Sequence, residues 1–193
     1  MFPLNLPNVL TVVRILLVPV LVVALLDHTP DGDLWAAIVF AVASLTDLLD
    51  GRLARSRGSI TTFGKLMDPL ADKLLIIAAL MALVSLHRVA AWVAMVIVAR
   101  EFAVTGMRMA AAQAGVVIAA GSFGKIKTAL QVAMVLSLIA VTGPRPLWLT
   151  ALVYATVAVT VLSGADYAFG LRNRLEASKR AGRAPRAAGT GDA

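Results

Sequence analysis

The sequence predicts an all-α, polytopic membrane protein with six transmembrane helices. Hydrophobic residues make up 60% of its 193 residues, and its mean hydropathy is +0.86. A soluble domain of this length is seldom so apolar. Six apolar segments recur along the chain, each close to the ~20 residues that a spanning helix needs. The chain has no cysteine, which excludes a disulfide framework, a thiolate nucleophile and a cysteine-based zinc site.

The apolar segments are separated by short connections, and no long polar linker divides the chain. They cover residues 9–26, 34–50, 66–86, 89–111, 126–142 and 147–170. The second and the fifth are short for a bilayer crossing, and the others have ample length. We therefore expect one transmembrane domain over 1–171. A basic tail over 172–193, poor in large apolar residues, is expected to be disordered.

The ends of the segments carry the polar residues. The first segment begins without the features of a signal peptide, and residues 2–8 are predicted to lie along the cytoplasmic interface with Phe2, Leu4 and Leu6 on the apolar side. The second segment ends in aspartates and the third begins with aspartates. The fourth and fifth carry basic residues near one end, and the sixth leads into the basic tail. The two histidines, His28 and His87, fall in short connections, which makes a histidine-dependent mechanism unexpected.

Basic residues are distributed unevenly among the connections, and their distribution predicts the orientation. The connection 27–33 has no Lys or Arg, and those at 87–88 and 143–146 have one Arg each. By contrast, the connection 51–65 has four basic residues, the region 108–127 has three, and the final tail has six. Cytoplasmic loops of membrane proteins carry the excess of Lys and Arg. Both termini and the even-numbered loops are therefore expected in the cytoplasm.

Four aspartates flank the basic connection between the second and third segments. Asp47 and Asp50 are three residues apart, and Asp68 and Asp72 are four apart, so each pair projects from one face of its helix. Four converging carboxylates repel one another unless cations lie between them. Oxygen ligands of this kind suit two Mg²⁺ or Mn²⁺ ions ~3.5–4 Å apart. The alternative is a set of solvated ion pairs with neighbouring basic residues, namely Arg52, Arg55, Arg57 and Lys73.

Small residues lie between the two pairs of aspartates. Gly51 and Ala54 have minimal side chains, as is needed where the backbone closely approaches a ligand. Arg55 is placed to meet a phosphate, and Gly64 opens the approach to the third segment. The stretch therefore indicates a ligand site beside the acids.

The whole pattern resembles the signature of the CDP-alcohol phosphatidyltransferases, a family of six-helix membrane enzymes. It reads Asp47-x-x-Asp50-Gly51-x-x-Ala54-Arg55, eight residues, Gly64, three residues, Asp68, three residues, Asp72. Every position is matched. The resemblance implies that the four aspartates hold two divalent metals that grip the CDP pyrophosphate, and that Asp72 deprotonates the acceptor alcohol. It also implies that Gly51, Ala54, Arg55 and Gly64 line the CDP site.

Three other stretches resemble the bacterial phosphatidylglycerophosphate synthases, which use glycerol 3-phosphate as acceptor. They are "NLPNVLTVVR" (5–14), "AREFAVTGMR" (99–108) and "GKIKTALQ" (124–131). The first stretch places Asn8 and Thr11 on one helix face and makes them candidates for the CDP site. Asn8 could instead cap the first helix.

The other two stretches supply candidates for binding the acceptor phosphate: Arg100, Arg108, Lys125 and Lys127. The two lysines open a helix, where positive charge opposes the helix dipole, and this hints at a bound anion. Two alternatives stay open. The lysines could serve only to set the topology, and Arg100 could form an internal salt bridge with an aspartate or with Glu101.

The resemblance thus implies an enzyme that transfers a phosphatidyl group from CDP-diacylglycerol to glycerol 3-phosphate. We expect it in the inner (plasma) membrane of a bacterium, as a homodimer among membrane lipids, with no nucleic-acid partner. Inositol phosphate, serine, and phosphatidylglycerol (for a cardiolipin synthase) stay open as acceptors. A small ion transporter would need acids across the bilayer, whereas these gather at one face. A non-catalytic scaffold would leave the spaced aspartates unexplained.

Overall fold

Six α-helices make up the described part of the chain. The computed structural model describes residues 6–27, 29, 31–57, 62–113 and 122–183, and it describes their side chains except at 6–8, 10, 47–57, 62–72, 122–123, 175 and 177–183. The helices are α1 (Leu6–Leu26), α2 (Gly32–Arg57), α3 (Thr62–Ser85), α4 (Ala91–Gln113), α5 (Ser122–Ala140) and α6 (Leu147–Arg183). No strand occurs among the described residues, and the all-α fold class is confirmed.

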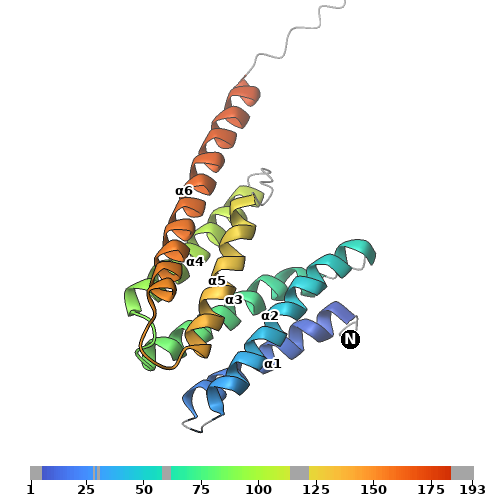
Figure 1. The fold of residues 1–193 in the computed structure, drawn as a ribbon. Coiled ribbons are helices and arrows are strands. Elements are labelled where there is room, and N and C mark those ends of the chain that lie inside the picture. Colours follow the sequence, from blue (N-terminus) through green and yellow to red (C-terminus); the bar gives the residue numbers. More distant parts are fainter. Residues whose placement is uncertain (1–5, 28, 30, 58–61, 114–121, 184–193) are drawn as a thin grey trace, which may run out of the picture.

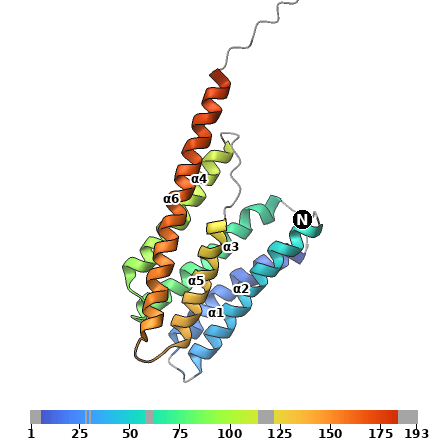
Figure 2. The ribbon, with the colours of Figure 1, turned by 45° about the horizontal axis from the view of Figure 1, so that its top comes forward.

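The helices form a bundle in which each runs opposite to the one before it (Figure 1). α1 packs against α2 and α3, while α6 packs against α4 and α5. α5 also contacts α2 and α3, which joins the two groups. Both views show α6 beside α4 along one side of the bundle (Figure 2). The core between the helices contains Leu21, Phe40, Leu80, Ile97 and Met134, all fully buried.

Large apolar side chains also cover the outside of the bundle. They include Val12, Leu16 and Val23 on α1, Leu34, Trp35 and Leu45 on α2, and Tyr154, Leu162 and Phe169 on α6. Soluble monomers rarely expose apolar surface this extensively, so the surface indicates a membrane protein.

The membrane-spanning potential of the helices is unequal. Among the described residues, the stretch Leu147–Arg174 of α6 is long and apolar enough by itself to cross a bilayer. Shorter apolar stretches cover Thr11–Leu26, Gly32–Thr46 and Lys73–Ser85. The six helices are present as predicted, while six membrane crossings stay a prediction.

Two helices extend beyond their predicted ends. α2 continues to Arg57 and α3 begins at Thr62, so most of the connection expected at 51–65 is helical. The prediction that the aspartates mark the ends of these helices is therefore wrong, and they lie inside them. The reason is that apolarity marks contact with lipid or core, whereas Arg, Leu and Ala, which fill "GRLAR", are strong helix formers in any surrounding.

The same reasoning applies to the last helix. α6 continues to Arg183, so residues 172–183 are helical where a disordered tail was expected to begin. This segment, "RNRLEASKRAGR", is rich in Arg, Leu, Glu, Ala and Lys, which favour helix. The interfacial segment predicted at 2–8 lies outside the described residues over 1–5, and its remainder belongs to α1.

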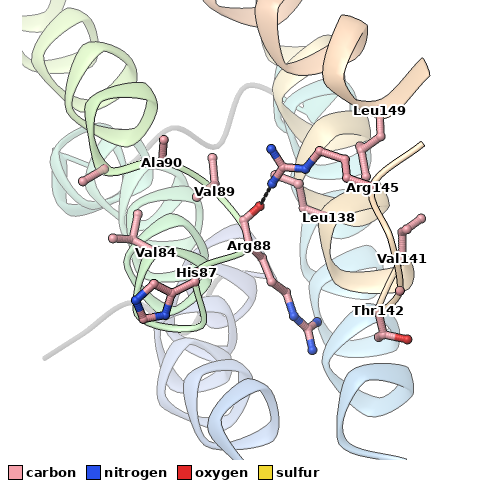
Figure 3. A pocket seen from close by; sticks show the side chains of 12 residues that line it. Val84, His87, Arg88, Val89, Ala90, Leu138, Val141, Thr142, Arg145 and Leu149 are labelled. Atoms are coloured by element: carbon pink, nitrogen blue, oxygen red, sulfur yellow. Dashed lines mark hydrogen bonds between the residues drawn. The ribbon is translucent and has the colours of Figure 1, made fainter. Parts of the chain in front are cut away.

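Loops close the end of the bundle that lies away from the aspartates. Arg88, between α3 and α4, donates from Nη1 and Nη2 to the two carboxylate oxygens of Asp33 in α2, at 2.6 and 2.8 Å. Arg88 Nη1 also donates to the Ile139 carbonyl at 3.2 Å. Arg145, in the loop before α6, donates to the Arg88 carbonyl (Figure 3). These loops surround a pocket of about 730 Å³, lined by apolar residues together with both arginines and His87.

One residue of this region has an unusual backbone. His87 has φ 57°, in the left-handed region, as it turns the chain from α3 toward α4. Its place in a loop confirms the expectation from the sequence, while His28 lies outside the described residues.

Candidate active site

The two aspartate pairs lie at the same end of the bundle, on consecutive helices. Asp50 lies about two turns before Arg57, where α2 ends, and Asp68 lies about two turns after Thr62, where α3 begins. Only residues 58–61 join the two helices, which keeps these ends near each other. Both pairs therefore lie at similar distances from the turn. The side chains of all four aspartates lie outside the described residues, so their convergence stays a prediction.

The other residues of the signature occupy the same part of the fold. Gly51, Ala54 and Arg55 lie in the last turns of α2, and Gly64 lies in the first turn of α3. Their side chains are also outside the described set, and their contacts with CDP stay a prediction. The described side chains contain no group of three or more His, Cys, Asp or Glu that could hold a metal elsewhere.

α1 packs against both helices of the signature and presents polar residues on its buried face. Thr11 and Arg14 are each only 3% exposed. A charged residue buried in an apolar helix is typical of a functional site. Because α1 begins at Leu6, Asn8 lies within its first turn, and the alternative that Asn8 caps the helix is wrong. The assignment of Asn8 and Thr11 to the CDP site stays a prediction.

A cluster of ion pairs lies where α4, α5 and α6 meet. Glu101 Oε1 accepts a hydrogen bond from Lys127 Nζ and lies 3.4 Å from Arg100 Nη1. Arg100 Nη2 donates to Ser163 Oγ at 3.1 Å, and Ser163 Oγ donates to the Thr160 carbonyl at 2.9 Å. The three charged side chains are between 6% and 14% exposed. The internal salt bridge that was the alternative for Arg100 is therefore present, with Glu101 as the partner.

The charges of this cluster do not balance. It contains two cations, Arg100 and Lys127, and one carboxylate, Glu101, among the described side chains. Burying a charge without a counter-charge is costly. This excess of positive charge among the described side chains suits an anionic ligand.

Unpaired polar groups accompany these charges. Gln131, one turn beyond Lys127 on α5, is 2% exposed, and its Nε2 finds no hydrogen-bond partner within the part of the chain that the structure describes. The same holds for Arg100 Nε and Thr160 Oγ1. Buried polar atoms in folded proteins are nearly always hydrogen-bonded. Such a gathering of unused donors is therefore typical of a ligand site.

The two remaining candidates for the acceptor site lie apart from the cluster. Arg108 is exposed, and its guanidinium lies 5.8 Å from the centre of the Tyr167 ring. Lys125 is exposed, whereas Lys127 is buried. This difference arises because residues two apart on a helix point about 200° from each other. The structure thus brings Arg100 and Lys127 together, and it does not bring Arg108 and Lys125 to them.

Sequence reasoning missed Gln131, Ser163 and Thr160 in this site. No motif marks α6, and its polar residues stand singly within an apolar segment. The signal was present: Thr156, Thr160 and Ser163 are all buried and lie on one face, since they are spaced four and three residues apart.

Comparison with known proteins agrees with the signature. Residues 4–162 match the model of the CDP-alcohol phosphatidyltransferase family, and the chain therefore belongs to this family. The family inferred from the motif is thus confirmed.

Several relatives are more specific. The chain is 41% identical over 179 residues to CDP-diacylglycerol–glycerol-3-phosphate 3-phosphatidyltransferase of Bacillus subtilis (strain 168), covering 84% of this chain and 93% of the relative. It is 40% identical over 167 residues to a probable phosphatidylglycerophosphate synthase of Mycobacterium tuberculosis (strain H37Rv), covering 84% and 79% respectively. It is 39% identical over 127 residues to the Rickettsia bellii protein with the same name as the first, covering 66% and 70%.

Proposed function

We propose that this chain transfers the phosphatidyl group of CDP-diacylglycerol to sn-glycerol 3-phosphate, giving phosphatidylglycerophosphate and CMP. The family sets the donor, and the relatives named for this reaction align with most of the chain. The observation that supports glycerol 3-phosphate as the acceptor is the buried, positively charged cluster of Arg100, Glu101 and Lys127. Glycerol 3-phosphate brings about two negative charges, and charge-assisted hydrogen bonds to such groups contribute ~1.5–3 kcal/mol each.

The reaction assigns a role to each part of the site. The acceptor hydroxyl attacks the β-phosphorus of CDP-diacylglycerol, the bond to CMP breaks, and the hydroxyl proton passes to the Asp72 carboxylate. Arg55 binds the pyrophosphate, while Gly51, Ala54 and Gly64 let the backbone approach CDP closely. Thr11 and Asn8 extend the CDP site from α1. Arg100 and Lys127 bind the acceptor phosphate, with Lys125 and Arg108 nearer the surface.

Asp47, Asp50, Asp68 and Asp72 would hold two Mg²⁺ or Mn²⁺ ions. The donors are all carboxylates, which suit these hard cations, and they lie within two consecutive helices, α2 and α3, that only residues 58–61 separate in sequence. Ions bound there would neutralise charge on the transferring phosphoryl group and on the departing CMP.

The membrane arrangement follows from helix length and charge. α1 has 21 residues and α5 has 19, which correspond to about 31 and 28 Å, close to the ~30 Å hydrocarbon core. We propose six crossings in a bacterial inner membrane with both termini and the active site on the cytoplasmic side, where the basic connections lie. Lipids would cover the apolar outer surface, and the family resemblance favours a homodimer.

The direct test is a product assay on the purified protein in detergent. CDP-diacylglycerol is supplied with glycerol 3-phosphate, serine, inositol phosphate or phosphatidylglycerol in separate reactions, and the lipid product is identified by mass spectrometry. We expect phosphatidylglycerophosphate and CMP from the first reaction, dependent on Mg²⁺ or Mn²⁺ and abolished by a chelator. A product formed only with another acceptor would refute the proposal while preserving the family assignment.

A further inference from the structure

α6 forms a surface against which the Arg100 side chain lies. Arg100 Nη2 donates to Ser163 Oγ, and Ser163 is itself anchored by its hydrogen bond to the Thr160 carbonyl. At the next residue, Gly164, an added Cβ would lie 3.2 Å from Arg100 Cγ and 3.8 Å from its Nε. The stem of Arg100 therefore passes over a position where α6 has no side chain. Ser163 and Gly164 directly follow the last residue matched by the family model.

Glu101 contacts both cations of the cluster. Its Oε1 atom contacts both Arg100 Nη1 and Lys127 Nζ, so one carboxylate oxygen lies between the two cations. Without that oxygen between them, the positive charges of Arg100 and Lys127 would repel each other strongly in an apolar surrounding. The carboxylate thus keeps two like charges close together.

The described side chains and backbone occupy only some of the donors of the two cations. Arg100 has five N–H donors and Lys127 has three. Glu101 and Ser163 accept from Arg100 Nη1 and Nη2, and Glu101 accepts one hydrogen bond from Lys127. Arg100 Nε and the Gln131 amide nitrogen have no acceptor in the described part of the chain. The remaining donors are of the kind that binds phosphate oxygens.

We infer that Glu101, Ser163 and Gly164 are positioning residues, which hold the Arg100 and Lys127 side chains together as the binding site for the phosphate of the acceptor. The inference rests on the proposed function, because it needs an acceptor that carries a phosphate. In this arrangement the negatively charged Glu101 improves the binding of the negatively charged acceptor, because it holds Arg100 and Lys127 in position.

The variant Glu101→Gln separates this role from a simple effect of charge. The substitution keeps the size of the side chain and removes its charge. If Glu101 only weakened the positive potential, the variant would bind glycerol 3-phosphate more tightly. If it positions the cations, the KM for glycerol 3-phosphate rises roughly tenfold. The Ki of inorganic phosphate as a competitor should rise in parallel, and the KM for CDP-diacylglycerol should stay constant.

The conservative variant Glu101→Asp gives a second measurement. It keeps the charge but shortens the side chain by one methylene, so its KM for glycerol 3-phosphate should lie between those of wild type and Glu101→Gln. A purely structural ion pair predicts a different result: both variants would lower the melting temperature and leave every KM unchanged. That outcome, or a lower KM in Glu101→Gln, would overturn the inference.

A matched pair of glycine variants tests the contribution of α6. Gly164→Ala places a methyl group against the Arg100 stem, whereas Gly170→Ala, on the same helix, adds the same methyl group where no heavy atom lies within 4 Å. The gain in helix propensity is the same for both. We expect Gly164→Ala to raise the KM for glycerol 3-phosphate by roughly threefold or more and Gly170→Ala to leave it unchanged. Equal values in the two variants would contradict the role of α6.

The activity of the wild-type enzyme distinguishes a failure of the proposed function from a failure of the inference. If wild type forms no phosphatidylglycerophosphate from glycerol 3-phosphate, the proposed function fails and the inference fails with it. If wild type is active and Glu101→Gln and Gly164→Ala both retain its KM values, only the inference fails. Should Glu101→Gln not fold, the glycine pair decides, because neither alanine removes a polar contact.

Discussion

Arg88 and Arg100 each pair with a carboxylate within the helix bundle, yet the two pairs differ in geometry and in charge. Arg88 makes two short hydrogen bonds to Asp33, at 2.6 and 2.8 Å, and a third to a backbone carbonyl. Arg100 lies 3.4 Å from one oxygen of Glu101 and shares that oxygen with Lys127. The first pair is balanced, one cation to one anion. The second has two cations for one anion and is the more buried of the two.

This difference suits a structural ion pair in the first region and the proposed acceptor site in the second. A bidentate arginine–carboxylate pair satisfies both carboxylate oxygens and stabilises the segments that it joins. A cluster with excess charge and unused donors costs folding free energy unless a ligand completes it. The two regions also lie in different parts of the bundle, the first at the loop end and the second between α4, α5 and α6. We therefore expect substitutions in the first region to affect stability and those near the second to affect catalysis.

The largest expected effect is on turnover. Asp72→Asn should reduce kcat by about 10²–10⁴-fold, because a general base contributes that much. Metal-dependent binding of CDP-diacylglycerol should be largely retained, which equilibrium binding would measure alongside single-turnover kinetics. Asp33→Asn, the same chemical change at the other end of the bundle, serves as the control and should leave kcat per folded enzyme unchanged. Wild-type turnover in Asp72→Asn would refute the assignment of the base.

The next effect concerns the acceptor and compares two neighbouring lysines. Lys127→Ala should raise the KM for glycerol 3-phosphate roughly 10–100-fold, because it removes a buried cation from the cluster. Lys125→Ala should change that KM little, since its side chain is exposed. Steady-state kinetics with each substrate varied in turn will measure both. If the lysines only set the topology, both variants would reduce the amount of inserted protein and leave both KM values unchanged.

A third prediction concerns the metal. Asp47→Asn should shift the Mg²⁺ concentration needed for half-maximal activity by roughly tenfold or more, since even residues outside the ligand shell contribute about 10–100-fold to metal affinity. A Mg²⁺ titration of activity, repeated with Mn²⁺, gives the measurement. The Asp33→Asn enzyme should titrate like wild type. An unchanged titration for Asp47→Asn would remove Asp47 from the set of ligands.

The smallest effect on activity is expected in the balanced pair. Asp33→Asn should lower the free energy of unfolding by about 1–3 kcal/mol, because the amide carries no charge and leaves Arg88 with one acceptor where the carboxylate offers two. The melting temperature in detergent reports this change. Both KM values should remain at wild type for the folded fraction. An altered KM for glycerol 3-phosphate would show that the two regions are coupled, and would contradict the separation drawn between them.

Much of the fold follows from the sequence because apolar segments of membrane proteins are long and uninterrupted. All six helices occur where the apolar segments predict them. The helix ends were less predictable, since α2 and α6 continue into basic residues that leave the apolar pattern but keep a high helix propensity. Hydropathy indicates whether a residue lies against lipid or core, and it does not indicate where a helix ends.

The candidate site likewise has a part that the sequence predicts and a part that it does not. The signature of Asp47, Asp50, Asp68 and Asp72 is local, so its spacing identifies the family without any knowledge of the fold. The contact between Arg100 and Ser163 joins residues 63 positions apart, and no local pattern encodes it. The same is true of the opposite orientations of Lys125 and Lys127, which depend on how α5 is rotated against its neighbours. Their charge made Lys125 and Lys127 equal candidates for the acceptor site.

The long separation between Arg100 and Ser163 also orders events during synthesis. Chains are made from the N-terminus at about 5–20 residues per second, so Ser163 is added roughly 3–13 s after Arg100. When Arg100 is added, α2 and α3 already carry the aspartates, and Glu101 follows at once. Lys127 arrives with α5, and the hydroxyl partner arrives only with α6, the last helix to be made. The aspartate signature is thus complete early on the ribosome, while the surroundings of Arg100 are complete only when the final helix has joined the bundle.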